Sequence, residues 1–152
     1  MSEAQVLGLL DASNAADSAL GSLGATKGAT REIKDFGLMI TREHHALRRE
    51  VQQMAGNLRL DVVPPSVALD VAPADAREAV DSAPPNAWEQ QYLALAVAQH
   101  DASMENLARA LAATKSPAVK RYIERAAPII QKHLDRAKRL QETANRAQPR
   151  KP

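Results

Sequence analysis

The chain of 152 residues contains no cysteine, and this excludes disulfides and thiolate metal sites. Its aromatic residues are equally scarce, with one Trp, two Tyr and one Phe. No apolar stretch approaches the roughly 18 residues of a membrane span, and no segment alternates with the two-residue period of a half-buried strand. A core built mainly of Ala, Leu, Ile and Val with few rings suits close-packed helices better than a β-sandwich or barrel. These absences favour an all-α protein.

Apolar residues spaced three and four apart predict four long helices, over residues 2–27, 31–57, 87–114 and 117–146. Thr30 and Ser116 are suitable N-caps, and the run Asn86 to Glu89 has the pattern of a capping box. Pro117 fits the first position of the fourth helix, whereas Pro128 lies inside it and predicts a kink. The helices therefore form two hairpins with short turns.

A long proline-rich connection, about residues 58–85, joins the two hairpins. Its proline pairs at 64–65 and 84–85 cannot continue a helix, although a short helix fits residues 74–80. About 28 residues can span the ~40 Å length of a 27-residue helix, which permits the ferritin-like topology without requiring it. We therefore expect a ferritin-like four-helix bundle as a single domain over residues 1–146, followed by a disordered basic tail at 147–152.

Each predicted helix carries one ionisable residue in its apolar stripe: Asp17, His44, His100 and His133. In a hairpin that turns near residue 29, Asp17 lies opposite residue 41, about 4.5 Å along the axis from His44. A hairpin that turns near residue 115 places His100 opposite residue 130, again about 4.5 Å from His133. The four side chains should therefore share one layer of the core.

Burial of these four polar groups needs compensation, because each unpaired group costs about 1–3 kcal/mol against a net stability of about 5–15 kcal/mol. One interpretation is a mononuclear metal site with three neutral imidazoles and a carboxylate as ligands. Another is a metal-free hydrogen-bonded network in which Asp17 orients one imidazole. A third is a different helix register that leaves some of these groups in solvent.

Residues beside this layer have weaker roles in the prediction. Glu43 flanks His44 and is a candidate acceptor for the outer nitrogen of a ligand imidazole. Met104 lies one turn from His100 and is expected to fill the core, or to be a weak axial contact if the metal were copper. His45 falls next to the stripe and should face the flank or solvent.

Three segments resemble the ferritin-like bundles of domain of unknown function family 4142, which are mostly bacterial and exported. The resemblance covers about residues 11–140. It is carried by REIKDFGLMITREHHALRREVQQMA, YLALAVAQHDASM and AAPIIQKHLDRA, with these matching positions: Ile33, Phe36, Glu43, His44, Leu47, Ala55, Tyr92, His100, Pro128 and His133. Asp17 stands where the family usually has Glu. The resemblance implies a periplasmic or exported protein.

Two features depart from what the resemblance suggests. Residues 1–18 lack the basic and apolar regions of a secretion signal, so a cytoplasmic protein and an exported protein without its leader are both compatible with the sequence. The di-iron pattern of ferritins needs Glu three residues before His on two helices, but Thr41, Val97 and Ile130 stand before the three histidines.

Three classes of function are compatible with these patterns. The leading hypothesis is a metal-handling or stress-resistance bundle that binds one zinc, copper or iron ion. The alternative is a metal-free structural or interaction module in which the buried layer fixes helix register. Its partner surface would be the basic fourth helix, because residues 115–152 hold eleven Lys and Arg against three acids, and this surface suits an anionic partner.

An enzyme ranks last, since the sequence offers no nucleophile, phosphate loop or substrate pocket. A pH sensor is a related hypothesis, because buried histidines charge near neutral pH. No nucleic-acid motif is present, and the sequence leaves the oligomeric state open.

Overall fold

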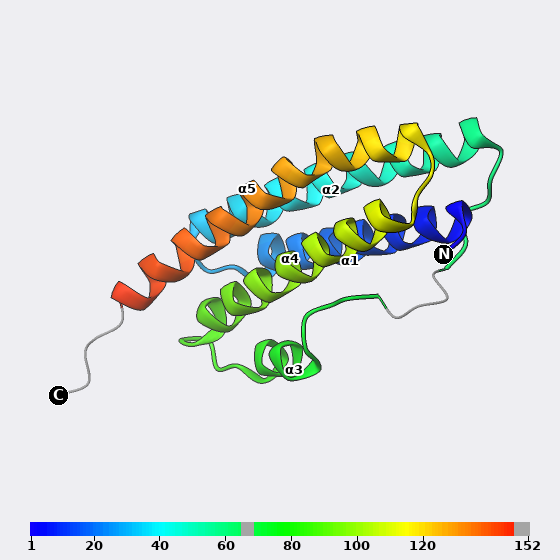
Figure 1. Cartoon of the computed structure of the whole chain (residues 1–152). Coiled ribbons are helices and arrows are strands. Elements are labelled where there is room, and N and C mark those ends of the chain that lie inside the picture. The colour runs from blue at the N-terminus through cyan, green and yellow to red at the C-terminus, as the bar shows by residue number, and fades with distance from the viewer. Residues whose placement is uncertain (65–68, 148–152) are drawn as a thin grey trace.

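The computed structural model describes residues 1–64 and 69–147, which form helices and their connections. The helices are α1 (Glu3–Lys27), α2 (Arg31–Leu58), α3 (Ala74–Ser82), α4 (Trp88–Ala113) and α5 (Pro117–Ala147). Four of them, α1, α2, α4 and α5, pack as a bundle, while α3 lies in the connection beside it (Figure 1). The predicted all-α class and the two hairpins with a long crossover are confirmed.

Parts of two predicted segments lie outside the described residues. Residues 65–68 belong to the predicted long connection, and 148–152 to the predicted basic tail. Ala147, which the prediction placed in that tail, is the last residue of α5. This helix continues through Pro128, and the kink there stays a prediction.

Short polar side chains cap the starts of α1, α2 and α5, and at α5 the predicted cap Ser116 accepts from Val119 N at 3.4 Å. The Ser2 hydroxyl accepts from Gln5 N in a complete capping box at the start of α1. Thr30 Oγ1 accepts from Ile33 N at 3.4 Å, as the sequence predicted for the second helix. Each cap satisfies an amide that has no partner within its own helix.

The predicted capping box at the start of α4 is wrong. The N-cap is Ala87 rather than Asn86, and it makes no side-chain cap hydrogen bond. The Glu89 carboxylate instead accepts from the backbone N–H groups of Ala29 and Thr30, at 2.8 and 2.7 Å. Two unpaired amides of the other hairpin are better donors for this carboxylate than one amide of its own helix.

The contacts of Glu89 define the direction of α4. Its first turn lies beside the α1–α2 turn, while its far end lies beside the start of α1, where Thr114 Oγ1 donates to Glu3 Oε2 at 2.7 Å. Helix α4 therefore runs antiparallel to α1 and parallel to α2. The crossover spans the length of the bundle, as the ferritin-like topology requires.

The crossover is bound to α4 by two buried amide side chains. Asn106 accepts from Asp70 N at 3.1 Å and donates to Asp70 O at 2.8 Å, while Gln99 accepts from Ala72 N at 3.1 Å. Near its start, Val63 O approaches Gly8 of α1 so closely that a β-carbon at Gly8 would collide with it. The connection thus covers the side of the bundle formed by α1 and α4 (Figure 1).

The bundle core consists of two apolar clusters separated along the axis by a polar layer. One cluster includes Val6, Leu47, Val51 and Ile130, and the other includes Phe36, Ile40, Tyr92 and Leu93. The buried polar residues between them include Ser13, Asn14, Asp17, His44, His100, Ser103 and His133. In the part of the chain that the structure describes, no helix has the length and apolar character needed to cross a lipid bilayer.

Helices α1 and α2 approach closely at two glycines. A β-carbon at Gly21 would lie 2.7 Å from Gly37 O, and one at Gly37 would collide with Gly21 O and Ala25 N. Backbone atoms cannot move aside as a flexible side chain can. Gly56, on the same helix as Gly37, has no atom within 4 Å of its virtual β-carbon.

We therefore predict opposite effects of two alanine substitutions in α2. Gly37→Ala should lower the free energy of unfolding by about 1–3 kcal/mol, because the new methyl group forces the two backbones apart. Gly56→Ala should raise it by roughly 0.5–1 kcal/mol, since it lowers the entropy of the unfolded chain without a clash. Urea denaturation followed by circular dichroism measures both. Equal effects of the two substitutions would contradict the close approach.

Candidate metal centre

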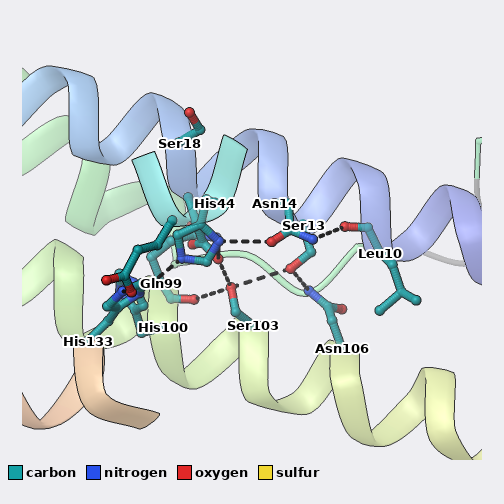
Figure 2. Close-up of polar contacts among 12 residues, drawn as sticks. Leu10, Ser13, Asn14, Ser18, His44, Gln99, His100, Ser103, Asn106 and His133 are labelled. Atoms are coloured by element: carbon teal, nitrogen blue, oxygen red, sulfur yellow. Dashed lines mark hydrogen bonds and ion pairs between the residues drawn. The ribbon is translucent and has the colours of Figure 1, made fainter. Parts of the chain in front are cut away.

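Three helices each place one histidine in the polar layer: His44 from α2, His100 from α4 and His133 from α5. All three side chains are 0% exposed. Their ring centroids lie 5.0 to 5.7 Å apart. One nitrogen from each ring lies within 4.8 Å of the corresponding nitrogens of the other two, a spacing that could hold a metal ion (Figure 2). The structure therefore brings together the three histidines that the sequence singled out.

The outer nitrogen of His44 is bound to an amide whose orientation is determined by its other contacts. Asn14 Nδ2 donates to Leu10 O at 2.8 Å and to Tyr122 Oη at 2.9 Å. Its Oδ1 must then face His44 Nδ1, which lies 2.9 Å away. An amide oxygen can only accept, so Nδ1 carries the proton and Nε2 has the free lone pair.

The other two rings have acceptors at their outer nitrogens as well. His100 Nδ1 lies 2.8 Å from Ala96 O, a backbone carbonyl that can only accept. His133 Nε2 lies 2.7 Å from Glu43 Oε2. Burial alone would raise the pKa of Glu43, but the hydrogen bonds from His133 and Lys132 outweigh it and lower the pKa. Glu43 is therefore ionised at neutral pH and accepts from His133.

With their outer nitrogens protonated, the neutral rings each keep one unprotonated nitrogen with a free lone pair. His44 Nε2 and His133 Nδ1 lie 3.2 Å apart. His100 Nε2 is buried and has no hydrogen-bond partner among the described residues. Acceptors at this distance repel unless a cation or a proton lies between them.

A proton is an unfavourable bridge between these nitrogens, because burial opposes the positive charge that an additional proton would place on the rings. Desolvation lowers the pKa of His44 well below its ordinary value, and the neighbouring rings of His100 and His133 lower it further. Desolvation also lowers the pKa of His100 to about 4, and that of His133 falls even though Glu43 opposes the shift. The rings are therefore neutral at pH 7, which is the protonation state that binds metal.

The fourth predicted ligand, Asp17, lies beside the group without being part of it. Its Oδ2 is 3.7 Å from His44 Nδ1, which is the outer nitrogen of that ring, and accepts from Ser103 Oγ at 2.5 Å. Its Oδ1 is buried without a hydrogen-bond partner. Desolvation raises the pKa of Asp17 to about 7, although the hydrogen bond from Ser103 opposes this shift. The role of Asp17 as a ligand stays a prediction.

The weaker candidates occupy different surroundings. Glu43 accepts from His133 as described, on the flank where the sequence placed it. Met104 is partly buried and packs against the apolar cluster that contains Leu107. His45 is exposed, next to its buried neighbour.

Sequence reasoning missed the residues that orient the layer. Asn14 and Ser103 are both buried, and each lies three residues from a predicted site residue, Asp17 and His100 respectively. Residues three apart lie on the same face of a helix, so this spacing was the available signal. It did not indicate which partner each side chain would choose.

The fold and the site define a class: a four-helix bundle with a buried group of three histidines in its core. The chain belongs to the family described as Domain of unknown function (DUF4142), whose model matches residues 1–140. The predicted family is therefore confirmed, and the match extends over all four bundle helices apart from the end of α5. No curated protein and no solved structure matches the chain.

The shifted pKa values predict how metal-free stability depends on pH. The folded-state pKa of His100, about 4, lies below its ordinary value of 6.5, so the unfolded chain binds more protons between these values and stability falls on acidification. His44 and His133 act in the same direction. Asp17 acts oppositely, because its pKa rises from 3.8 to about 7 and its ionisation destabilises the fold as pH increases.

On acidification, the stability lost through the three histidines should exceed the stability gained through the single carboxyl group of Asp17. We expect the melting temperature, measured in chelator, to fall between about pH 6.5 and about pH 4. The Asp17→Asn variant lacks the opposing carboxyl group and should lose stability more steeply over that interval. A parent melting temperature that rises on acidification would contradict the assignment of buried neutral rings.

Proposed function

We propose that this protein binds a single transition-metal ion at the centre of its bundle. The ligand atoms are His44 Nε2, His100 Nε2 and His133 Nδ1. The observation that carries the proposal is that one nitrogen of each ring lies within 4.8 Å of those of the other two, while the outer nitrogen of each ring donates to an oxygen. Metal-bound histidines almost always have such an outer acceptor, which fixes the tautomer and ring orientation.

The donor set indicates the class of metal. Neutral imidazoles suit zinc, copper and iron, and this chain has no thiolate to compete with them. We propose Asp17 as the fourth ligand, because its Oδ1 is a buried carboxylate oxygen without a hydrogen-bond partner. Since Asp17 lies outside the group of three histidines, its side chain has to turn toward the ion to bind it. Its negative charge would also partly neutralise the ion within the low-dielectric core.

The site is proposed to be mononuclear. A ferritin-type pair of metals needs bridging carboxylates one helical turn from the histidines, and those positions hold Thr41, Val97 and Ile130. One ion held by three helices also stabilises the fold, because the unfolded chain offers no preformed site. This supports a role in metal handling or resistance to metal stress. Location outside the cytoplasm, which the family resemblance implies, is part of the same proposal.

Removal of one ligand tests the proposal against a matched control. The parent should bind about one zinc ion per chain and melt several degrees higher with excess zinc, because ligand at 100 times its Kd adds about 2.7 kcal/mol of stability. His100→Ala should weaken zinc binding more than about 100-fold, which exceeds the usual cost of losing an outer hydrogen-bond partner. His45→Ala removes the exposed neighbouring histidine and should bind zinc as the parent does.

The measurements are isothermal titration calorimetry and thermal melting with zinc, copper(II) or iron(II), starting from chelator-treated protein. Equal affinity of the parent and His100→Ala would exclude the core site. If none of the three metals bound to the parent, the layer would be a metal-free hydrogen-bonded network.

A further inference from the structure

The histidine group is shielded from solvent on every side by its own bundle, so an ion needs a route to it. The three rings are 0% exposed, and Asn14 and Ala96, which accept from two of them, are buried as well. The third acceptor, Glu43, is different, since its side chain is 32% exposed. Among the described hydrogen-bond partners of the ring nitrogens, only Glu43 connects the group directly with solvent.

Two other sides of the bundle are closed by the packing described above. Helices α1 and α2 meet at Gly21 and Gly37, with no room even for a β-carbon. The face between α1 and α4 lies beneath the crossover, which Gln99 and Asn106 hold by its backbone. Glu43 of α2 and His133 of α5 lie on a different side of the bundle, where these two helices meet.

A surface depression of about 310 Å³ lies on α2 and includes Glu43. All of its lining residues belong to that helix: Asp35, Leu38, Met39, Arg42 and Glu43. One Glu43 oxygen accepts from His133 Nε2 of α5 at 2.7 Å, and the other accepts from Lys132 Nζ of the same helix at 3.2 Å. Lys132 is 58% exposed, so its ammonium group can leave this ion pair for water at little cost.

We propose that Glu43 is the uptake residue of the metal site, carrying a divalent cation from the surface depression to His133, and that Lys132 holds this route closed. The inference rests on the proposed function. A carboxylate that touches both solvent and a ligand imidazole can bind a cation transiently before the ion reaches the buried nitrogens. The Lys132 ammonium occupies the same carboxylate and repels an incoming cation, so it must move before the ion binds.

The bundle offers a matched control for Glu43 on the same pair of helices. Glu50, seven residues further along α2, pairs with Arg125 of α5 at 2.8 Å. It is also a half-exposed carboxylate with one cationic partner on α5. None of its described contacts involves a histidine of the site. Glu50→Gln therefore reproduces the loss of a surface charge without affecting the proposed route.

The experiment is stopped-flow loading of the metal-free full chain with zinc chloride, followed by release into excess chelator. Glu43→Gln keeps an amide oxygen for His133 but loses the charge, and it should slow loading at least about tenfold. Release should slow as well, because the same passage serves both directions. Glu50→Gln should load within about twofold of the parent. Lys132→Ala should load faster than the parent, and Arg125→Ala should not.

The rate of zinc release distinguishes a Glu43 that carries the ion from a Glu43 that only orients the His133 ring. If Glu43 only oriented the His133 ring, Glu43→Gln would release zinc faster than the parent and load at the parent's rate, and the inference would be overturned. Equal loading of Glu43→Gln and Glu50→Gln, with the parent still binding zinc at equilibrium, would also overturn it while leaving the proposed function intact. A parent that binds no zinc at equilibrium would overturn both.

Discussion

Each buried imidazole has two ring nitrogens, and in its neutral form only one of them carries a proton. In this bundle all three protons go outward, to an amide, a backbone carbonyl and a carboxylate. The inner nitrogens are then left as acceptors with no donor, at the point where three helices meet. Burying such groups costs free energy unless something positive is shared between them. The rest of the bundle keeps these nitrogens together against that cost.

The fold achieves this by packing apolar residues on both sides of the polar layer. One cluster surrounds Val51 and Ile130, the other surrounds Phe36 and Tyr92, and neither side can slide without breaking its own contacts. The parallel order of α2 and α4 follows from the long crossover, which Glu89 and Glu3 secure at opposite ends of the bundle. A one-residue shift of α2, α4 or α5 would rotate its histidine by about 100° away from the layer, and the same shift of α1 would rotate Asn14 away from His44. The register of the four helices is therefore part of the site.

Much of this arrangement was predictable from the sequence, because helical periodicity and hairpin length are local properties. The spacing of apolar residues placed His44, His100 and His133 in one layer, and Thr30 was identified as a helix cap. The failures involve choices between partners on different helices. Glu89 took backbone amides of the other hairpin instead of capping its own helix. The contacts of Asp17 with His44 and Ser103 were also beyond sequence reasoning, because they depend on packing that no single helix determines, and its role as a ligand stays a prediction.

The nitrogens that carry protons determine whether the three rings can bind one ion, and nitrogen-15 NMR of the histidine rings observes these protons directly. We expect protons on His44 Nδ1, His100 Nδ1 and His133 Nε2 in the zinc-loaded protein. The shifts caused by zinc should be largest at the other nitrogen of each ring. Zinc-induced shifts at the outer nitrogens, at His45 alone, or at none of the rings would contradict this expectation.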